Sequence, residues 1–142
     1  MKKPLHLVFC AAFAMLAAHP ALAQEGISQQ EAEQFAAVVF SSDIKAGKLT
    51  RQKAGTFFKC GNDRYAKKLS ADPQMAMTLA DATMALNTAT KKLSAAEKEK
   101  YGRAYKEAER LQREAEDGCR KELGIDPSVK RLFDGFGAAA SH

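Results

Sequence analysis

The most apolar helical pattern in this sequence covers residues 72–93. Asp72 can accept hydrogen bonds from free backbone N–H groups, and Pro73 lacks only a donor that has no partner in the first turn, so this pair marks a helix start. Apolar residues then recur at alternating spacings of four and three, which places them on one helix face. That face comprises Met75, Leu79, Ala82, Leu86, Ala89 and Leu93.

A second apolar strip, formed by Met77, Ala80 and Met84, runs along the same predicted helix. A helix that is apolar on two sides needs cover on both. We therefore predict that residues 72–93 form the central helix of a small bundle. Asp81 falls on the second strip, where a buried carboxylate needs a partner. It either joins an internal ion pair or hydrogen bond, or lies in a groove and contacts a cationic ligand or partner.

The sequence before this helix predicts further helices. Ser28 and Glu31 have the spacing of a capping box, and Gly47 can supply the left-handed residue that ends the first helix. A second amphipathic pattern covers residues 51–69. Its Gly-Asn-Asp triplet at residues 61–63 can interrupt a helix, so this segment forms either one kinked helix or two.

The longest helix is predicted after the central one. Ser94 and Glu97 again have capping-box spacing, and Gly124 follows the last periodic residue. The Asp-Pro pair at the start of residues 126–133 predicts a short final helix. The apolar face of the long helix comprises Tyr101, Ala104, Tyr105, Ala108, Leu111, Ala115, Cys119 and Leu123.

The expected fold class follows from these patterns. After residue 23 no stretch alternates as a strand would, and no internal repeat is visible. We expect an all-α bundle of four to five helices, with one domain over residues 24–134 and a flexible C-terminal tail over residues 135–142.

Residues 1–23 have the three parts of a signal peptide. Lys2 and Lys3 precede an apolar run over residues 7–18, and the Ala-Leu-Ala sequence at residues 21–23 suits the processing enzyme. We expect cleavage after residue 23 and a periplasmic protein with no transmembrane segment after processing. Attachment of a lipid at Cys10 is the alternative, although the bulky Phe9 disfavours it.

The cysteines predict a disulfide. Of the three in the sequence, Cys10 leaves with the signal peptide, so Cys60 and Cys119 remain as one pair. In an oxidising compartment an even pair is typical of a structural disulfide rather than a reactive thiol or a metal site.

The residues offer little conventional chemistry. After processing, the one remaining histidine is His142 in the predicted tail, so nucleophile–histidine catalysis and zinc binding lack their residues. Glycine-rich phosphate loops and haem-attachment motifs are absent. Met75, Met77 and Met84 could bind copper, but methionine in a helix is ordinarily core packing. We therefore expect no enzyme, metal or cofactor; a carboxylate site without a sequence motif is the enzymatic alternative.

Positive charge is concentrated in residues 45–68, where eight Lys and Arg face Asp63 alone. Loss of Lys2 and Lys3 would lower the net charge of the whole chain from +5 to +3, so this segment dominates the balance. The basic face either keeps a helix solvated or attracts an acidic protein. Nucleic acid is not expected, because exposed aromatic residues are not interleaved with the charges. The candidate partner-binding residues are Lys53, Lys59, Arg64, Lys67 and Asp81.

Two functional hypotheses remain. An exported disulfide-bonded bundle without catalytic residues indicates a protein that binds another envelope or secreted protein, as an inhibitor, an immunity protein or a chaperone-like factor. The alternative is a carrier that holds a small or lipidic ligand between its helices, favoured by the methionines and alanines of residues 72–93. An internal cavity would favour the carrier, and an exposed apolar patch with a charged rim would favour the protein binder.

Overall fold

The computed structural model describes residues 26–87 and 92–133, so the predicted signal peptide and the tail over residues 135–142 lie outside the described residues. All regular secondary structure in the described part is helical, which confirms the all-α class. Five helices follow one another in the order α3 (Gln29–Val39), α4 (Ser41–Lys45), α5 (Arg51–Ser70), α6 (Pro73–Asn87) and α7 (Ala95–Leu123).

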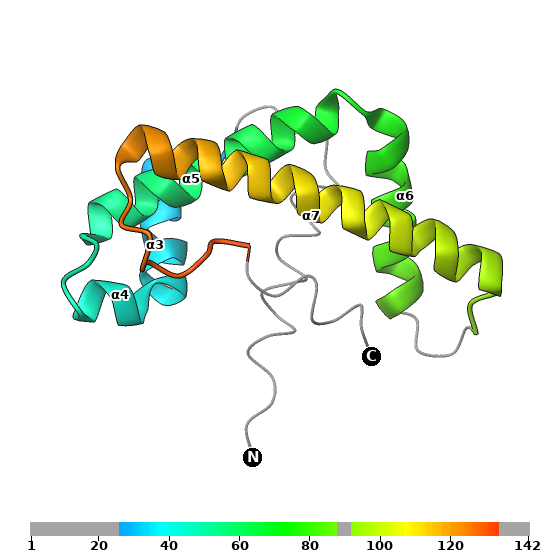
Figure 1. Cartoon of the computed structure of the whole chain (residues 1–142), viewed down its shortest axis with the longest axis horizontal. Helices are drawn as coiled ribbons and strands as arrows, with labels where there is room; N and C mark the ends of the chain where they lie inside the picture. The colour runs from blue at the N-terminus through cyan, green and yellow to red at the C-terminus, as the bar shows by residue number, and fades with distance from the viewer. Residues whose placement is uncertain (1–25, 88–91, 134–142) are drawn as a thin grey trace, which may run out of the picture.

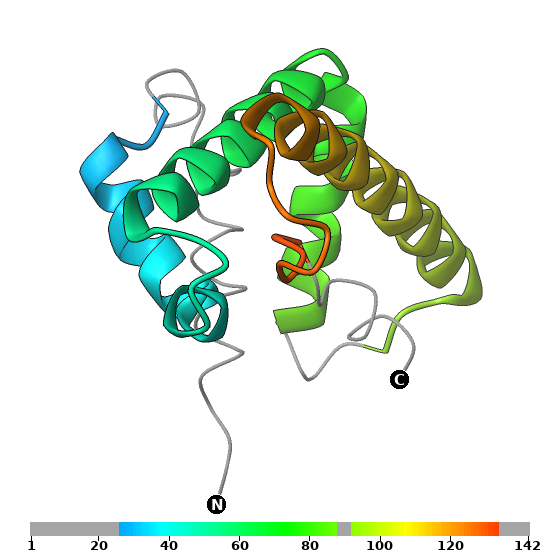
Figure 2. The same cartoon turned by 60° about the vertical axis from the view of Figure 1, so that its left-hand side comes forward.

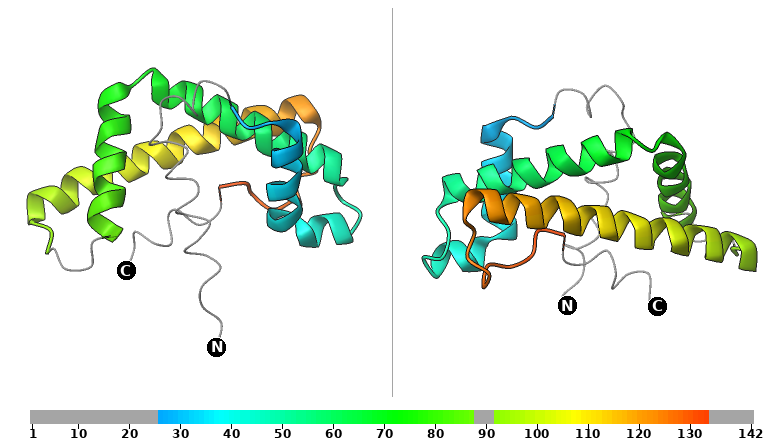
Figure 3. Two further views of the ribbon diagram at one scale, coloured as in Figure 1. Left: turned by 180° about the vertical axis from the view of Figure 1, so that it is seen from behind. Right: turned by 45° about the horizontal axis from the view of Figure 1, so that its top comes forward.

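The helices α5 and α7 form the frame of the molecule. They run antiparallel beside each other. The helix α3 packs against the first half of α5 and is followed by α4, and α6 descends from the far end of α5 (Figures 1 and 3). The chain after α7 turns back under this frame, between α4 and α6 (Figure 2). None of the described helices is long and apolar enough to cross a bilayer.

The helix starts predicted at Ser28, Asp72 and Ser94 are confirmed. Ser28 and Ser94 each form a complete capping box, with the hydroxyl accepting from the backbone N–H three residues on. The Thr50 hydroxyl accepts a hydrogen bond from the Lys53 N–H at 3.1 Å. The carboxylate of Asp72 accepts one from the Met75 N–H at 3.0 Å. Local side-chain chemistry therefore sets where the helices begin.

The first predicted helix is divided at Phe40. The backbone there has φ −103° and ψ 22°, so α3 ends and α4 begins around this residue. The Phe40 side chain is fully buried and its ring lies 5.6 Å from that of Phe57. The backbone N–H groups of Phe40 and Ile44 still donate to carbonyls four residues back, so helical hydrogen bonds are present on both sides of the division.

The segment left open by the sequence is one continuous helix, α5. Its Gly-Asn-Asp triplet lies inside the helix. Gly61 allows the C-terminal segment to approach, because a Cβ there would lie 2.4 Å from Leu132 Cδ2. The Asn62 amide donates to the Phe58 carbonyl at 2.7 Å, and Asp63 forms an ion pair with Lys59. These contacts keep the triplet helical.

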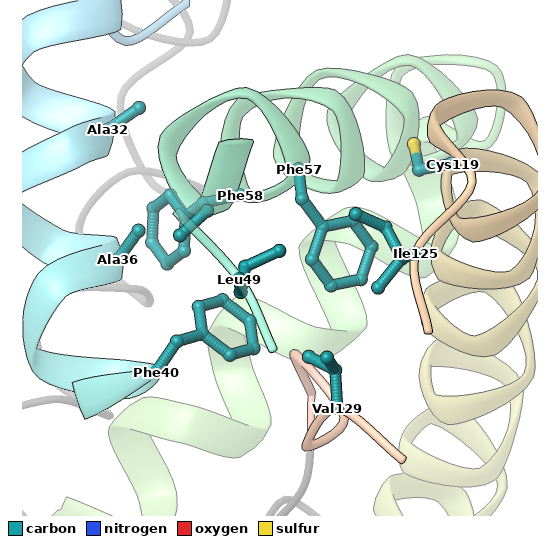
Figure 4. Packing of buried hydrophobic residues seen from close by; sticks show 10 residues of the cluster. Ala32, Ala36, Phe40, Leu49, Phe57, Phe58, Cys119, Ile125 and Val129 are labelled. Atoms are coloured by element: carbon teal, nitrogen blue, oxygen red, sulfur yellow. The ribbon is translucent and has the colours of Figure 1, made fainter. Parts of the chain in front are cut away.

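The main core lies between α3, α5 and the C-terminal segment, not around residues 72–93 (Figure 4). Phenyl rings of Phe40, Phe57 and Phe58 fill it, and each buries more apolar area than the alanines and methionines of α6 can. Cys119 also reaches this core, where it forms a disulfide with Cys60 whose Cα atoms lie 6.0 Å apart. The buried members of the core are Ala32, Ala36, Phe40, Leu49, Ala54, Phe57, Phe58, Cys119, Ile125 and Val129.

The predicted central position of residues 72–93 is wrong. The helix α6 packs through its first apolar face only, where Met75 and Ala82 are buried beside Leu69 and Leu111. The second predicted strip, represented by Met77 and Met84, is exposed to solvent. Phe40 and the phenylalanines of α5 fill the main core, and α6 instead covers the far end of α5 and α7. Ala89 lies outside the described residues.

The predicted short helix over residues 126–133 is also wrong. This segment consists of turns, because the Asp126 carboxylate accepts from the Ser128 N–H at 2.7 Å and closes a local turn. Further along, the Lys130 N–H donates to Asp43 at 3.1 Å. Ile125 and Val129 are buried in the core. Side chains such as Asp43 accept the backbone hydrogen bonds that carbonyl groups would accept in a helix.

Close packing of α3 on α5 yields a prediction with a matched control. A Cβ at Gly55 would lie 2.9 Å from the Glu33 Cα, whereas a Cβ at Gly102 meets no atom within 4 Å. We expect Gly55→Ala to lower the free energy of unfolding by about 1–3 kcal/mol through overpacking. Gly102→Ala should raise it by about 0.5–1 kcal/mol, because alanine favours the helix. Urea unfolding of both variants checks this, and equal effects would contradict the close approach of α3 to α5.

Candidate functional site

Three of the four predicted basic contact residues already have partners within the fold. The Lys53 ammonium donates to the Gly124 carbonyl at 3.4 Å, at the C-terminal end of α7, where a cation is favourable. Lys59 pairs with Asp63 at 2.8 Å. The Arg64 guanidinium pairs with Glu122 of α7. Lys67 is exposed and forms no ion pair within the described residues.

A shallow groove runs along the junction of α5 and α7. It is lined by both signs of charge, and Glu114 pairs across it with Lys68 at 3.2 Å. The hydrogen bond from Lys68 and the charge of Arg110 hold the pKa of the Glu114 carboxyl below its usual value. Such exposed pairs contribute little to stability. The groove lining comprises Arg64, Lys67, Lys68, Ala71, Glu114 and Ala115.

Asp81 lies apart from these basic residues, on the exposed face of α6. Of the alternatives left open for Asp81, the structure does not support the internal ion pair, because the carboxylate is exposed and no ion pair joins it to a cation among the described residues. At 100° per residue, Met77, Asp81 and Met84 point away from the packed face that holds Met75 and Ala82. We call Met77, Asp81 and Met84 the outer strip of α6.

The outer strip is the most exposed large apolar feature of the described residues. Met77 and Met84 each expose 69% of their surface, although Met75 on the packed face exposes only 9%. A smaller apolar area on α3 comprises Phe35 and Val38. Phe35 is partly used by the fold, because its ring stacks on Phe58 with the centroids 5.9 Å apart. The two methionines of α6 therefore expose a larger share of their surface than Phe35 and Val38 do.

A buried ionic cluster that the sequence did not reveal lies on the other side of α7. Glu116 is 1% exposed, and its carboxylate accepts from Arg120 and from the Leu132 N–H, both at 3.0 Å. Arg131 approaches the same carboxylate to 3.5 Å. Arg120 also donates to the Val129 carbonyl at 2.9 Å and lies over the Phe57 ring. The cluster fastens the C-terminal segment to the frame, which is a structural role.

Buried polar groups also occur where Tyr65 meets α7. Burial raises the pKa of Tyr65 to about 12, and a hydrogen bond with Gln112 partly offsets this rise. Gln112 is itself buried, and its Oε1 has no hydrogen-bond partner among the described residues. A phenol with so high a pKa stays protonated at neutral pH and cannot serve as a general base there.

The described residues contain no group of three His, Cys, Asp or Glu side chains that could hold a metal ion. Comparisons with protein-family models, with curated proteins and with solved structures find no match to this chain. The functional conclusion therefore depends on the surface of this molecule.

The buried cluster yields a prediction about stability. Glu116→Gln removes the charge that faces Arg120 and Arg131, so we expect a loss of about 3 kcal/mol in the free energy of unfolding. Glu114→Gln is the matched control, because its carboxylate is half exposed and should cost less than about 1 kcal/mol. Chemical unfolding measures both values. Similar losses for the two variants would contradict a fastening role for Glu116.

Proposed function

We propose that the protein is an exported, non-enzymatic binding protein that docks onto another protein of the cell envelope through the outer strip of α6. Inhibition of that protein, immunity against a secreted toxin and chaperone-like assistance are all actions of this kind. The observation that carries the proposal is the exposure of Met77 and Met84 on a helix whose opposite face is firmly packed.

The physical case is that α6 presents apolar side chains on a supported scaffold. Its inner face packs on Leu111 of α7 and Leu69 of α5, and these two helices are joined by the disulfide. Docking therefore requires little ordering of the helix itself, which lowers the entropic cost of association. Methionine suits such a surface, because its flexible side chain and polarisable sulfur adapt to a partner.

The groove between α5 and α7 is open to solvent and is not itself an enclosed ligand cavity. A carrier needs enclosed apolar space between helices. The groove instead lies on the outside of the frame and carries Arg64, Lys68 and Glu114 on its walls. An acidic region of the partner could still make a secondary contact through Lys67, whose charge is exposed.

Export is part of the proposal and has its own test. The charged start, apolar run and Ala-Leu-Ala site of residues 1–23 support it, as does the disulfide between Cys60 and Cys119. Intact-mass measurement of the protein from the periplasm should give a chain that begins at Gln24 and does not react with a thiol reagent before reduction. A chain that retains residues 1–23, or a free thiol, would contradict this.

The binding surface is tested by placing charges on it. We expect Met77→Lys together with Met84→Lys to abolish capture of a protein from the envelope of the producing cell or of competitor bacteria. The matched control is Val38→Lys, which adds a charge to an exposed apolar residue on α3. Circular dichroism melts should be nearly unchanged in both variants, because these side chains are exposed.

The comparison of the two variants decides the result. Loss of capture in the α6 variant alone supports the proposal. Equal capture by wild type and the α6 variant would show that the binding surface lies elsewhere. If Lys67→Glu alone abolishes capture, the binding surface is the basic face.

A further inference from the structure

We infer that the partner offers an apolar groove with a Lys or Arg side chain at its middle, which receives the outer strip of α6 and pairs with Asp81. This inference rests on the proposed function and adds the chemistry of the partner. The inferred site on the partner is cationic, whereas the basic residues of α5 would attract an acidic site.

The geometry of the strip favours a groove. Met77, Asp81 and Met84 follow the spacing of four and three that anchors a helix in an apolar groove. The two methionines lie seven residues apart, or about 10 Å along the helix. Met77 and Met84 remain 69% exposed on the rounded surface of the helix, so a concave partner surface gives a larger contact than a flat one.

The charge at the centre of the strip selects a cation. Asp81 is the one charged residue in α6, and it lies between the two methionines. When the methionines enter a groove, they exclude water from the carboxylate between them. An unpaired carboxylate would then oppose binding, whereas a Lys or Arg would give a strengthened ion pair. The partner therefore has to supply that cation.

The same charge argues against a second copy of this chain as the occupant. In a two-fold contact between two outer strips, whether parallel or antiparallel, Asp81 of each copy would lie near Asp81 of the other, because it is close to the midpoint of the strip. Two carboxylates in an apolar contact repel each other and stay unpaired. Charge complementarity thus favours a different protein.

The test combines a cross-link with charge variants. A photoreactive amino acid at position 74, which is exposed next to the strip, leaves the three strip residues intact. After irradiation in envelope extract, mass spectrometry sequences the attached peptide. Binding of the identified partner is then measured for wild type, Asp81→Asn, Asp81→Lys and the control Asp63→Asn, which neutralises an exposed carboxylate on α5.

The inference predicts a cross-linked peptide that contains a Lys or Arg among apolar residues. Asp81→Asn should weaken binding at least about 30-fold and Asp81→Lys more, with little effect of Asp63→Asn. Reversing the partner's cation to Glu should restore binding of Asp81→Lys.

Several results would overturn the inference. Equal binding by wild type and both Asp81 variants would show that the partner has no cation opposite Asp81, although the methionines could remain the docking surface. A cross-linked peptide without a cation, or one from a second copy of this chain, would do the same. A wild-type protein that captures nothing would overturn the proposed function together with the inference.

Discussion

The disulfide between Cys60 and Cys119 is the constraint on which the rest of the structure depends. It joins α5 to α7 across 59 residues of sequence, and closing so long a loop contributes up to about 4 kcal/mol in the chain-entropy model. The helices α3 and α6 pack on this pair, and α4 contacts α3. The α3 helix and the C-terminal segment share the core beside it, and α6 covers its far end through a smaller apolar cluster. Because the frame is fixed covalently, one face of α6 can remain exposed without loss of the fold.

The sequence predicted the helix starts and the class because those depend on neighbouring residues. Ser28, Ser94 and Asp72 cap helices by accepting hydrogen bonds from N–H groups three residues away, and the apolar stripe of α7 is buried or half-buried, as its spacing indicated. The position of α6 could not be predicted in this way. A periodic pattern shows that a helix face is apolar, but it does not show whether that face or the phenyl rings of α5 occupy the core, because this depends on how the helices assemble. The turns over residues 126–133 likewise depend on distant groups such as Asp43.

The candidate site illustrates the same limit. Asp81 shares a strip with two methionines, as the spacing predicts, but the strip faces solvent, so the carboxylate needs no internal partner. Glu116 shows the opposite case. The pattern places it among the exposed charges of α7, but it is buried in the fold. Its position directly after Ala115 of the apolar stripe was the available signal. The predicted basic residues remain exposed or half-exposed, although three of them are engaged within the fold.

The central claim is that α6 lies at the edge of the fold with its outer strip exposed, and methionine oxidation tests it most directly. The chain after residue 23 contains three methionines, Met75, Met77 and Met84, all in this helix. Dilute hydrogen peroxide converts exposed thioethers to sulfoxides, and peptide mass spectrometry follows each residue separately. The structure predicts fast oxidation of Met77 and Met84 in the folded protein and slow oxidation of Met75. Protection of all three methionines, or equal rates that match those of the unfolded chain, would contradict it.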